Sequence, residues 1–226
     1  MLKIDILTLF PNMFKGPFDE SIIKRAQDKK LVEINIHDLR KWGQGERRTV
    51  DDRPYGGGVG MVLMVEPIDK ALKQLKTKDS KVILLTPRGK TFDQEKARNM
   101  ANIKHIILIA GHYEGLDERI SEHLIDEELS IGDYVLTGGE LPVMVIVDAI
   151  SRLIPGVLDK KDATLYESFS ESNLLEYPQY TRPEEYNGWK VPEVIVSGNH
   201  GEINKWRAKK AEEKTKTVRP DLNPEK

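Results

Sequence analysis

Short apolar runs alternate with polar, glycine-bearing stretches along the middle of the chain. KVILL, HIILIA and DYVL are three such runs, and each is followed by a polar loop and then by a helical pattern. The loops read TPRGKTF, GHYEGLDE and TGGELP; the helices are predicted at 93–100, just after GHYEGLDE, and over VMVIVDAISRL. Continuous apolar runs are typical of strands covered on both faces. The repeat therefore predicts an α/β domain with a parallel sheet.

Two further strands and a helix are predicted near the N-terminus. KIDILTLF forms an apolar run, and LVEINIHDL alternates as a half-buried strand does. Between them, DESIIKRAQDK predicts a helix with Asp19 as its N-cap. The polar stretch 40–60 holds six glycines and no periodicity. A loop of this length inside a compact domain indicates a functional or a disordered segment.

The pattern changes after Gly156. The polar sequence DKKDATLYESFSESN predicts a linker, and the segment beyond it begins rich in proline and aromatic residues and ends as a basic helix. We therefore expect a first domain over 1–158, a linker over 159–170 and a small, mostly helical C-terminal domain over 171–226.

Composition narrows the class of protein. The 226 residues are 38% hydrophobic and 32% charged, as in soluble globular proteins. No apolar run reaches the roughly 18–20 residues of a membrane span, and the N-terminus lacks the pattern of a secretory signal. Without cysteine the chain has no disulfide, thiolate zinc site or cysteine nucleophile, and its five histidines are scattered. We expect a cytoplasmic protein without a membrane partner or a dedicated metal site.

The net charge of −2 does not by itself indicate a nucleic-acid partner. Between Lys205 and Arg219, however, seven basic residues face only two acids. Charge alone favours a solvated helix face for such a run.

The three glycine-bearing loops predict a ligand site. In open α/β sheets, ligands bind beyond the carboxyl ends of the strands, where all three loops lie. Their glycines expose backbone groups to a ligand, and apolar and polar side chains surround them: Gly111, Gly132, Gly138, Gly139, Ile131, Tyr134, Leu136, His112, Glu114, Asp117 and Glu140. Neither GxxxxGK[ST] nor GxGxxG after a strand occurs, so a polyphosphate is not indicated. Any one loop is explained by a turn, but the three together favour a pocket for a ring such as adenine.

Seven motifs in order give the chain a resemblance to a known family. They are ILTLFPNMF, VDDRPYGGGVGM, GHYEGLDERI, SIGDYVLTGGELP, SRLIPGVL, YPQYTRP and SGNHGEINKWR. Together they resemble the bacterial tRNA (guanine-N1)-methyltransferases of the knotted SPOUT class, over nearly the whole chain. The resemblance implies methyl transfer from S-adenosylmethionine to N1 of the guanosine at tRNA position 37. It also implies a deep trefoil knot, which general topology rules disfavour, and a homodimer with the active site at the subunit interface.

The resemblance assigns a role to individual residues. Cofactor binding falls on three loops: Thr86, Pro87, Gly111, Tyr113, Glu114, Ile131, Gly132, Asp133, Tyr134, Val135, Leu136, Gly138, Gly139 and Pro142. Arg152 matches the arginine that stabilises charge on guanine O6. Glu167 stands where the family has an aspartate base, and Glu171 and Glu176 are alternatives. Contacts to the anticodon stem-loop of tRNA fall on Arg182, Lys205, Arg207, Lys209 and Lys210.

Other readings stay open. An RNA-binding protein with a ligand pocket but no transfer activity is one, because the base position is substituted. A SPOUT-type methyltransferase acting on a different RNA is another. The family's association with magnesium leaves room for a Mg²⁺ requirement, although the sequence offers no metal-ligand cluster.

Overall fold

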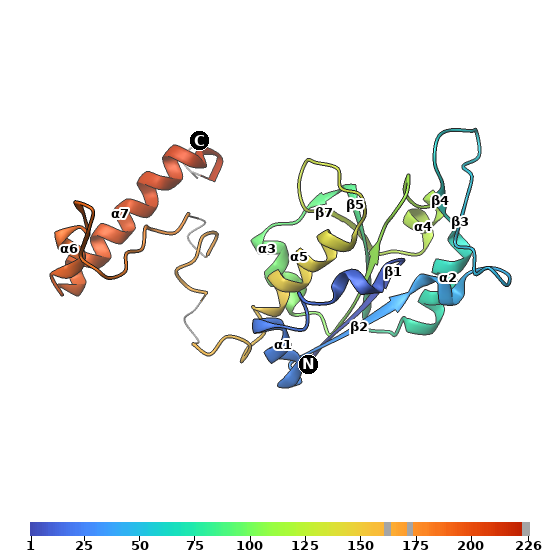
Figure 1. Cartoon of the computed structure of the whole chain (residues 1–226), viewed down its shortest axis with the longest axis horizontal. Coiled ribbons are helices and arrows are strands. Elements are labelled where there is room, and N and C mark those ends of the chain that lie inside the picture. Colours follow the sequence, from blue (N-terminus) through green and yellow to red (C-terminus); the bar gives the residue numbers. More distant parts are fainter. Residues whose placement is uncertain (161–163, 171–173, 223–226) are drawn as a thin grey trace. The chain divides into compact units, whose positions relative to one another are not determined.

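The computed structural model describes residues 1–160, 164–170 and 174–222. The chain divides into two compact units, Met1–Asp159 and Lys160–Lys226. Figure 1 shows an α/β first unit and a second unit built around one long helix. The second unit includes most of the stretch for which the sequence predicts a linker. The predicted start of the C-terminal domain at residue 171 lies outside the described residues.

A five-stranded parallel sheet organises the first unit, as predicted. Its strand order is β2-β1-β6-β5-β7, and every neighbouring pair is parallel. The strands are β1 Leu2–Thr8, β2 Val32–Asp38, β5 Ser80–Thr91, β6 His105–Ala110 and β7 Glu127–Ser130. A separate antiparallel pair joins β3 Asp51–Asp52 to β4 Val62–Leu63, inside and just after the long polar stretch. The carboxyl ends of the parallel strands share one edge of the sheet.

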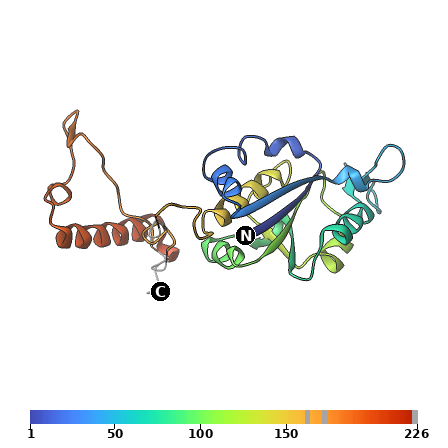
Figure 2. The ribbon, with the colours of Figure 1, turned by 90° about the horizontal axis from the view of Figure 1, so that it is seen from below.

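Helices cover both faces of this sheet, which explains the continuous apolar runs in β5 and β6 (Figures 1 and 2). One core lies under α1, α3 and α5, and the other under α2 and α4. Their bounds are α1 Ser21–Asp28, α2 Val65–Leu75, α3 Gln94–Ala101, α4 Glu118–His123 and α5 Glu140–Ser151, with 3-10 turns at η1 Pro11–Phe14 and η2 Leu39–Trp42. Strand β6 is buried along its whole length between the two cores.

The third predicted strand was wrong. DYVL belongs to a loop, and the strand of this unit is β7, Glu127–Ser130. A hydrophobic pattern does not indicate this strand, because the strand contains two glutamates. Their charges are accommodated by pairing with other side chains. Glu127 contacts Lys81 at 2.7 Å and also Lys96, and Glu128 accepts a hydrogen bond from Ser121 at 2.6 Å.

Three other elements differ from the sequence prediction. Strand β5 resumes after a break in register and pairs Lys90 with Leu129, so part of the predicted TPRGKTF loop is strand. Helix α1 begins at Ser21 with Glu20 as its N-cap, so the prediction of Asp19 in that position was wrong. Helix α2 was not predicted, although Ile68, Ala71 and Leu72 form its buried stripe.

The second unit holds a hairpin and helices. Its elements are β8 Glu185–Tyr186, β9 Trp189–Lys190, α6 Glu193–Val196, α7 His200–Val218 and η3 Pro220–Leu222. The segment before the hairpin packs along α7. The backbone N–H of Leu175 donates to the buried Oγ1 of Thr215 at 2.9 Å, and the Arg207 guanidinium lies 4.8 Å from the centre of the Tyr177 ring. Among the described residues, no helix is long and apolar enough to cross a membrane.

Candidate functional site

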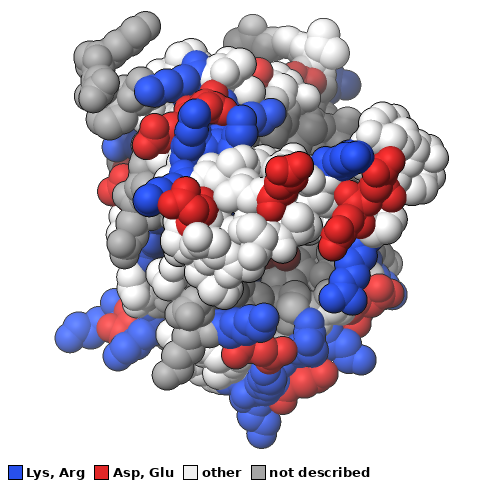
Figure 3. Space-filling view, turned by 90° about the vertical axis from the view of Figure 1, so that its left-hand side faces the viewer, with Lys and Arg blue, Asp and Glu red and all other residues white. Residues whose placement is uncertain are grey.

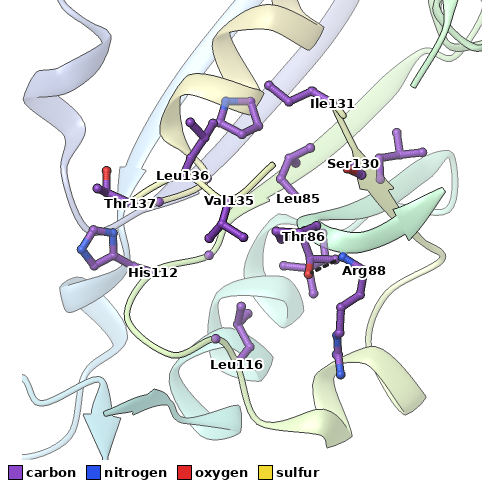
Figure 4. A pocket seen from close by; sticks show the side chains of 18 of the residues that line it. Leu85, Thr86, Arg88, His112, Leu116, Ser130, Ile131, Val135, Leu136 and Thr137 are labelled. Carbon is purple, nitrogen blue, oxygen red and sulfur yellow. Dashed lines mark hydrogen bonds between the residues drawn. The ribbon is translucent and has the colours of Figure 1, made fainter. Parts of the chain in front are cut away.

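A cavity of about 400 Å³ opens at the carboxyl edge of the sheet. The register break in β5 and the loops after β6 and β7 line it, together with α4 and the first turn of α5. Figure 4 shows Leu85 and Ile131 at the cavity, with His112 on one side and Arg88 on the other. Its volume lies within the range of small-molecule sites, roughly 300–1,000 Å³.

Two of the loops are joined directly at Gly138 and Gly139. The N–H of Gly139 donates to the carbonyl of Gly111 at 2.7 Å, and a β-bridge pairs His112 with Gly138. A Cβ on Gly139 would lie 2.7 Å from the Cα of Ala110, closer than packed atoms allow. The glycine pair therefore serves close approach of two loop backbones, and this approach shapes one wall of the cavity.

The loop 131–137 presents apolar side chains that the sheet does not bury. Val135 is 84% exposed and Tyr134 54% exposed. The hydroxyl of Tyr134 donates to the Ile131 carbonyl at 3.3 Å, and the Ser130 hydroxyl donates to the Gly132 carbonyl at 3.0 Å. These contacts hold the loop in a turn beside the cavity. Such a wall suits the faces of a flat apolar ring.

The loop 111–117 is tied to strand β4 on the other side. Leu63 donates its N–H to the Gly115 carbonyl at 3.0 Å, and Asp117 donates its N–H to the Leu63 carbonyl at 2.9 Å. The Asp117 carboxylate caps α4 by accepting from the N–H of Arg119. Hydrogen bonding from the Arg119 side chain lowers the pKa of Asp117. Asp117 thus orders the loop and α4 and is not one of the cavity-lining residues.

An ion pair lies at the border of the cavity. Arg88 contacts Glu118 at 2.9 Å and Glu128 at 3.7 Å, and both Arg88 and Glu118 line the cavity. Its hydrogen bond with Glu118 raises the pKa of Arg88 above the ordinary value. The ion pair between Arg88 and Glu118 joins β5 to α4.

Comparison with known proteins decides the family of this chain. The family model described as tRNA (Guanine-1)-methyltransferase TrmD matches residues 2–225. A tRNA (guanine-N(1)-)-methyltransferase of Dictyoglomus turgidum is 57% identical over 222 residues, covering 98% of this chain and 90% of the relative. A protein of the same name from Mycoplasmopsis synoviae is 55% identical over 221 residues, covering 98% and 96%. The chain belongs to the tRNA (guanine-N1)-methyltransferase family. The resemblance drawn from the seven motifs is confirmed.

The cavity brings together almost all the residues that the family resemblance assigns to the cofactor. Every one of them except Asp133 lines it. Sequence reasoning assigned no cofactor role to the other lining residues: Leu84, Leu85, Arg88, His112, Gly115, Leu116, Glu118, Ser121, Leu129, Ser130 and Thr137. His112 was already named among the polar residues of the predicted pocket. Other lining residues stand inside quoted motifs, so position within the motif was the available signal: Gly115, Leu116, Glu118, Ser130 and Thr137. Arg88 and Ser121 had none.

The two residues assigned to the methyl-transfer chemistry of the family belong to different units. Arg152 is the half-buried C-cap of α5 in the first unit. Glu167 is half-buried in the second unit, where its carbonyl accepts from the N–H of Ser170 at 3.2 Å. Their meeting stays a prediction. Of the alternative bases, Glu176 is half-buried in the second unit, and Glu171 lies outside the described residues.

The residues assigned to tRNA contact lie in the second unit. Arg182 is exposed, and Arg207 stacks on Tyr177. The three assigned lysines of α7 are paired with acids: Lys205 with Glu202 at 2.9 Å, and Lys209 and Lys210 with Glu213 at 3.9 and 2.7 Å. Basic and acidic side chains are interleaved on the face in Figure 3. No group of three or more potential metal-ligating side chains occurs within the described parts of the chain.

Proposed function

We propose that this chain transfers the methyl group of S-adenosylmethionine to N1 of guanosine 37 in tRNA, and that the cavity holds the cofactor. Membership of the tRNA (guanine-N1)-methyltransferase family establishes the reaction class. The observation that carries the cofactor assignment is the convergence of the break in β5 and the two glycine-bearing loops after β6 and β7 on one cavity. Exposed backbone groups suit the polar edge of adenine, and Leu85, Ile131 and Leu136 suit its faces.

Bound S-adenosylmethionine supplies a methyl group on a sulfonium, so the C–S bond breaks as the C–N1 bond forms. Guanine N1 carries a proton at neutral pH and is a poor nucleophile. The Glu167 carboxylate takes this proton, and the Arg152 guanidinium stabilises the negative charge that moves to O6. Glutamate keeps the carboxylate of the family's aspartate and reaches one methylene further.

We also propose the trefoil knot and the homodimer for this chain. The contacts of the 131–139 segment with Gly111 and His112, and the second pairing of β5 with β7, support a knotted arrangement of these loops. Leu141 and Val145 are about half exposed on α5, the helix that ends at Arg152, and their exposure supports a partner subunit at this helix. Each active site is then formed by residues of two chains. We place the protein in the cytoplasm. A role for Mg²⁺ is a further proposal.

Methyl transfer to a defined nucleotide tests this function. The full chain is incubated with radiolabelled S-adenosylmethionine and an unmodified tRNA transcript carrying guanosine 37. Label at N1 of that guanosine is expected. A matched transcript with adenosine at position 37 should remain unlabelled. Label elsewhere in the RNA contradicts the position, and cofactor and RNA binding without transfer supports the RNA-binding alternative.

A further inference from the structure

His112 carries a buried polar atom that the proposed mechanism does not use. Its ring lines the cavity (Figure 4), and its Nδ1 is buried without a hydrogen-bond partner in the described part of the chain. The ring is held between Phe10 and Tyr113, with centroid distances of 4.7 and 5.0 Å. A buried nitrogen without a hydrogen-bond partner is unfavourable, so such an atom calls for a functional explanation.

Glu140 lies next to Gly138, as this nitrogen does, and its carboxylate is held by a hydrogen bond from strand β1. It is 1% exposed and is the first residue of α5. Its Oε1 accepts a hydrogen bond from the buried hydroxyl of Thr8 at 2.8 Å, at the carboxyl end of β1. Glu140 is therefore fixed by the sheet and its own helix.

A short gap separates the two groups. Nδ1 of His112 lies 3.9 Å from Oε2 of Glu140. An N–H···O hydrogen bond needs about 2.7–3.2 Å, so a movement of about 1 Å completes it. A Cβ on Gly138 would lie 2.4 Å from Oε2 and 2.6 Å from Nδ1. Glycine at this position is what lets the carboxylate and the imidazole face each other.

We propose that His112 is a positioning residue, whose Nδ1–H closes onto Oε2 of Glu140 when the cofactor occupies the cavity. The closed pair clamps the turn at Gly138 against the loop that begins at Gly111. Both loops wall the cavity, so the bond adds to cofactor affinity without its atoms touching the methyl group. This inference rests on the proposed function, because it takes S-adenosylmethionine as the ligand of the cavity.

Two variants of His112 separate the clamp from direct contact with the ligand. In His112→Asn the side-chain amide nitrogen takes the place of Nδ1, whereas in His112→Gln it takes the place of Nε2. Calorimetry of the full chain with S-adenosylmethionine should show a Kd about 10-fold higher or more for His112→Gln, the scale of one hydrogen bond to a charged group. His112→Asn should recover most of the loss.

Other outcomes overturn the clamp. Binding kept by His112→Gln and lost by His112→Asn indicates that Nε2 contacts the ligand directly. Equal Kd values for the two variants show that a donor at Nδ1 is irrelevant. The kinetic pattern gives a second readout: the KM for S-adenosylmethionine should rise in His112→Gln while the single-turnover rate at saturating cofactor stays near that of the original chain. A purely structural defect changes the unfolding free energy instead.

A double-mutant cycle tests the partner. If Nδ1 acts through Glu140, the double variant His112→Gln/Glu140→Gln should bind the cofactor little worse than Glu140→Gln alone. Losses that multiply show that the two residues act separately and contradict the clamp. Should Glu140→Gln fail to fold, the comparison of the two His112 variants decides alone. If the original chain does not bind S-adenosylmethionine in the calorimeter, the proposed function itself is refuted. This outcome is distinct from a failure of the clamp, in which the original chain binds the cofactor.

Discussion

His105 and Asp5 form a buried pair across neighbouring strands: Nε2 of His105 lies 2.6 Å from Oδ2 of Asp5. The other carboxylate oxygen accepts from Nε2 of His37 at 2.8 Å, and Lys3 lies 3.1 Å from Oδ2. Asp5 is 1% exposed. Burial alone raises the pKa of such a carboxyl, but the hydrogen bonds from His37, His105 and Lys3 outweigh it and leave the pKa of Asp5 far below its usual range.

The first prediction concerns stability in acid. Because the folded pKa of Asp5 is depressed, its contribution is complete above the unfolded value of about 3.9 and is lost as the pH falls below it. Asp5→Asn should lower the unfolding free energy at pH 7 by about 3 kcal/mol, the scale of hydrogen bonds to a charged group. Urea unfolding at several pH values measures this. The deficit should shrink between pH 4 and pH 2, and a constant deficit contradicts the assignment.

The second prediction concerns the joined loops. Gly139→Ala places a Cβ 2.7 Å from the Cα of Ala110, so the two loop backbones must separate. We expect the Kd for S-adenosylmethionine to rise by about 100-fold or more, as misplacement by about an ångström does for site geometry. Gly201→Ala is the matched control, because its nearest neighbour is 3.5 Å away. Equal cofactor binding by both variants argues against the loop contact as a wall of the site.

The third prediction concerns the base. Glu167→Gln keeps the shape of the side chain and removes its basicity, so the single-turnover methyl-transfer rate should fall by roughly 100-fold or more. Cofactor affinity should barely change. Glu167→Asp tells whether the longer side chain is needed: a slower rate than glutamate means that it is. Full activity in Glu167→Gln moves the role to Glu176 or Glu171.

The fourth prediction concerns tRNA binding by α7. Glu213 pairs with both Lys209 and Lys210, and its hydrogen bond with Lys210 lowers its pKa. Glu213→Gln removes a negative charge near the phosphates that these lysines are proposed to meet. Affinity for tRNA should rise a few-fold at low salt, with a steeper salt dependence. Glu95→Gln in the first unit serves as the control. Equal gains from both variants indicate a general effect of net charge.

The fifth prediction concerns assembly. Val145→Glu places a charge on the half-exposed side of α5. If this helix meets a partner subunit, the variant should be monomeric by light scattering at micromolar concentration and inactive in methyl transfer. Lys24→Glu on α1 is a surface control. An active monomer, of the original chain or of the variant, contradicts the shared site.

Local pattern predicted the parts of the fold that depend on apolar runs. Strand β6 and helix α5 are continuous apolar segments, and both were placed within a few residues. Strand β7 was missed because ion pairs and a hydrogen bond from other elements satisfy its Glu127 and Glu128. Its apolar neighbour DYVL was taken for the strand, although Val135 within it is largely exposed. A short window of sequence does not contain such long-range pairing.

The candidate site, like the fold, could be predicted from the sequence only in part. Glycine-bearing loops after strands predicted a pocket because parallel strands end at one edge. The facing of His112 and Glu140 depends on Thr8, on Gly138 and on the β-bridge between loops, and no spacing rule relates these positions. Arg88 entered the site through a register break in β5, which a regular strand pattern does not indicate. The pairing of Arg152 with Glu167 in one active site stays a prediction, which rests on the family resemblance and not on a local pattern.

The hydrogen bond between Thr8 and Glu140 spans 132 positions of the chain. A ribosome makes the N-terminal strand first and reaches the start of α5 only after most of the first unit has been synthesised. Until then, Thr8 at the end of β1 lacks the Glu140 carboxylate to which its hydroxyl donates. The two loops at Gly111 and Gly138 cannot meet either. Contacts of such separation form late and slowly. The wall of the pocket is therefore complete only after the start of α5 has been synthesised.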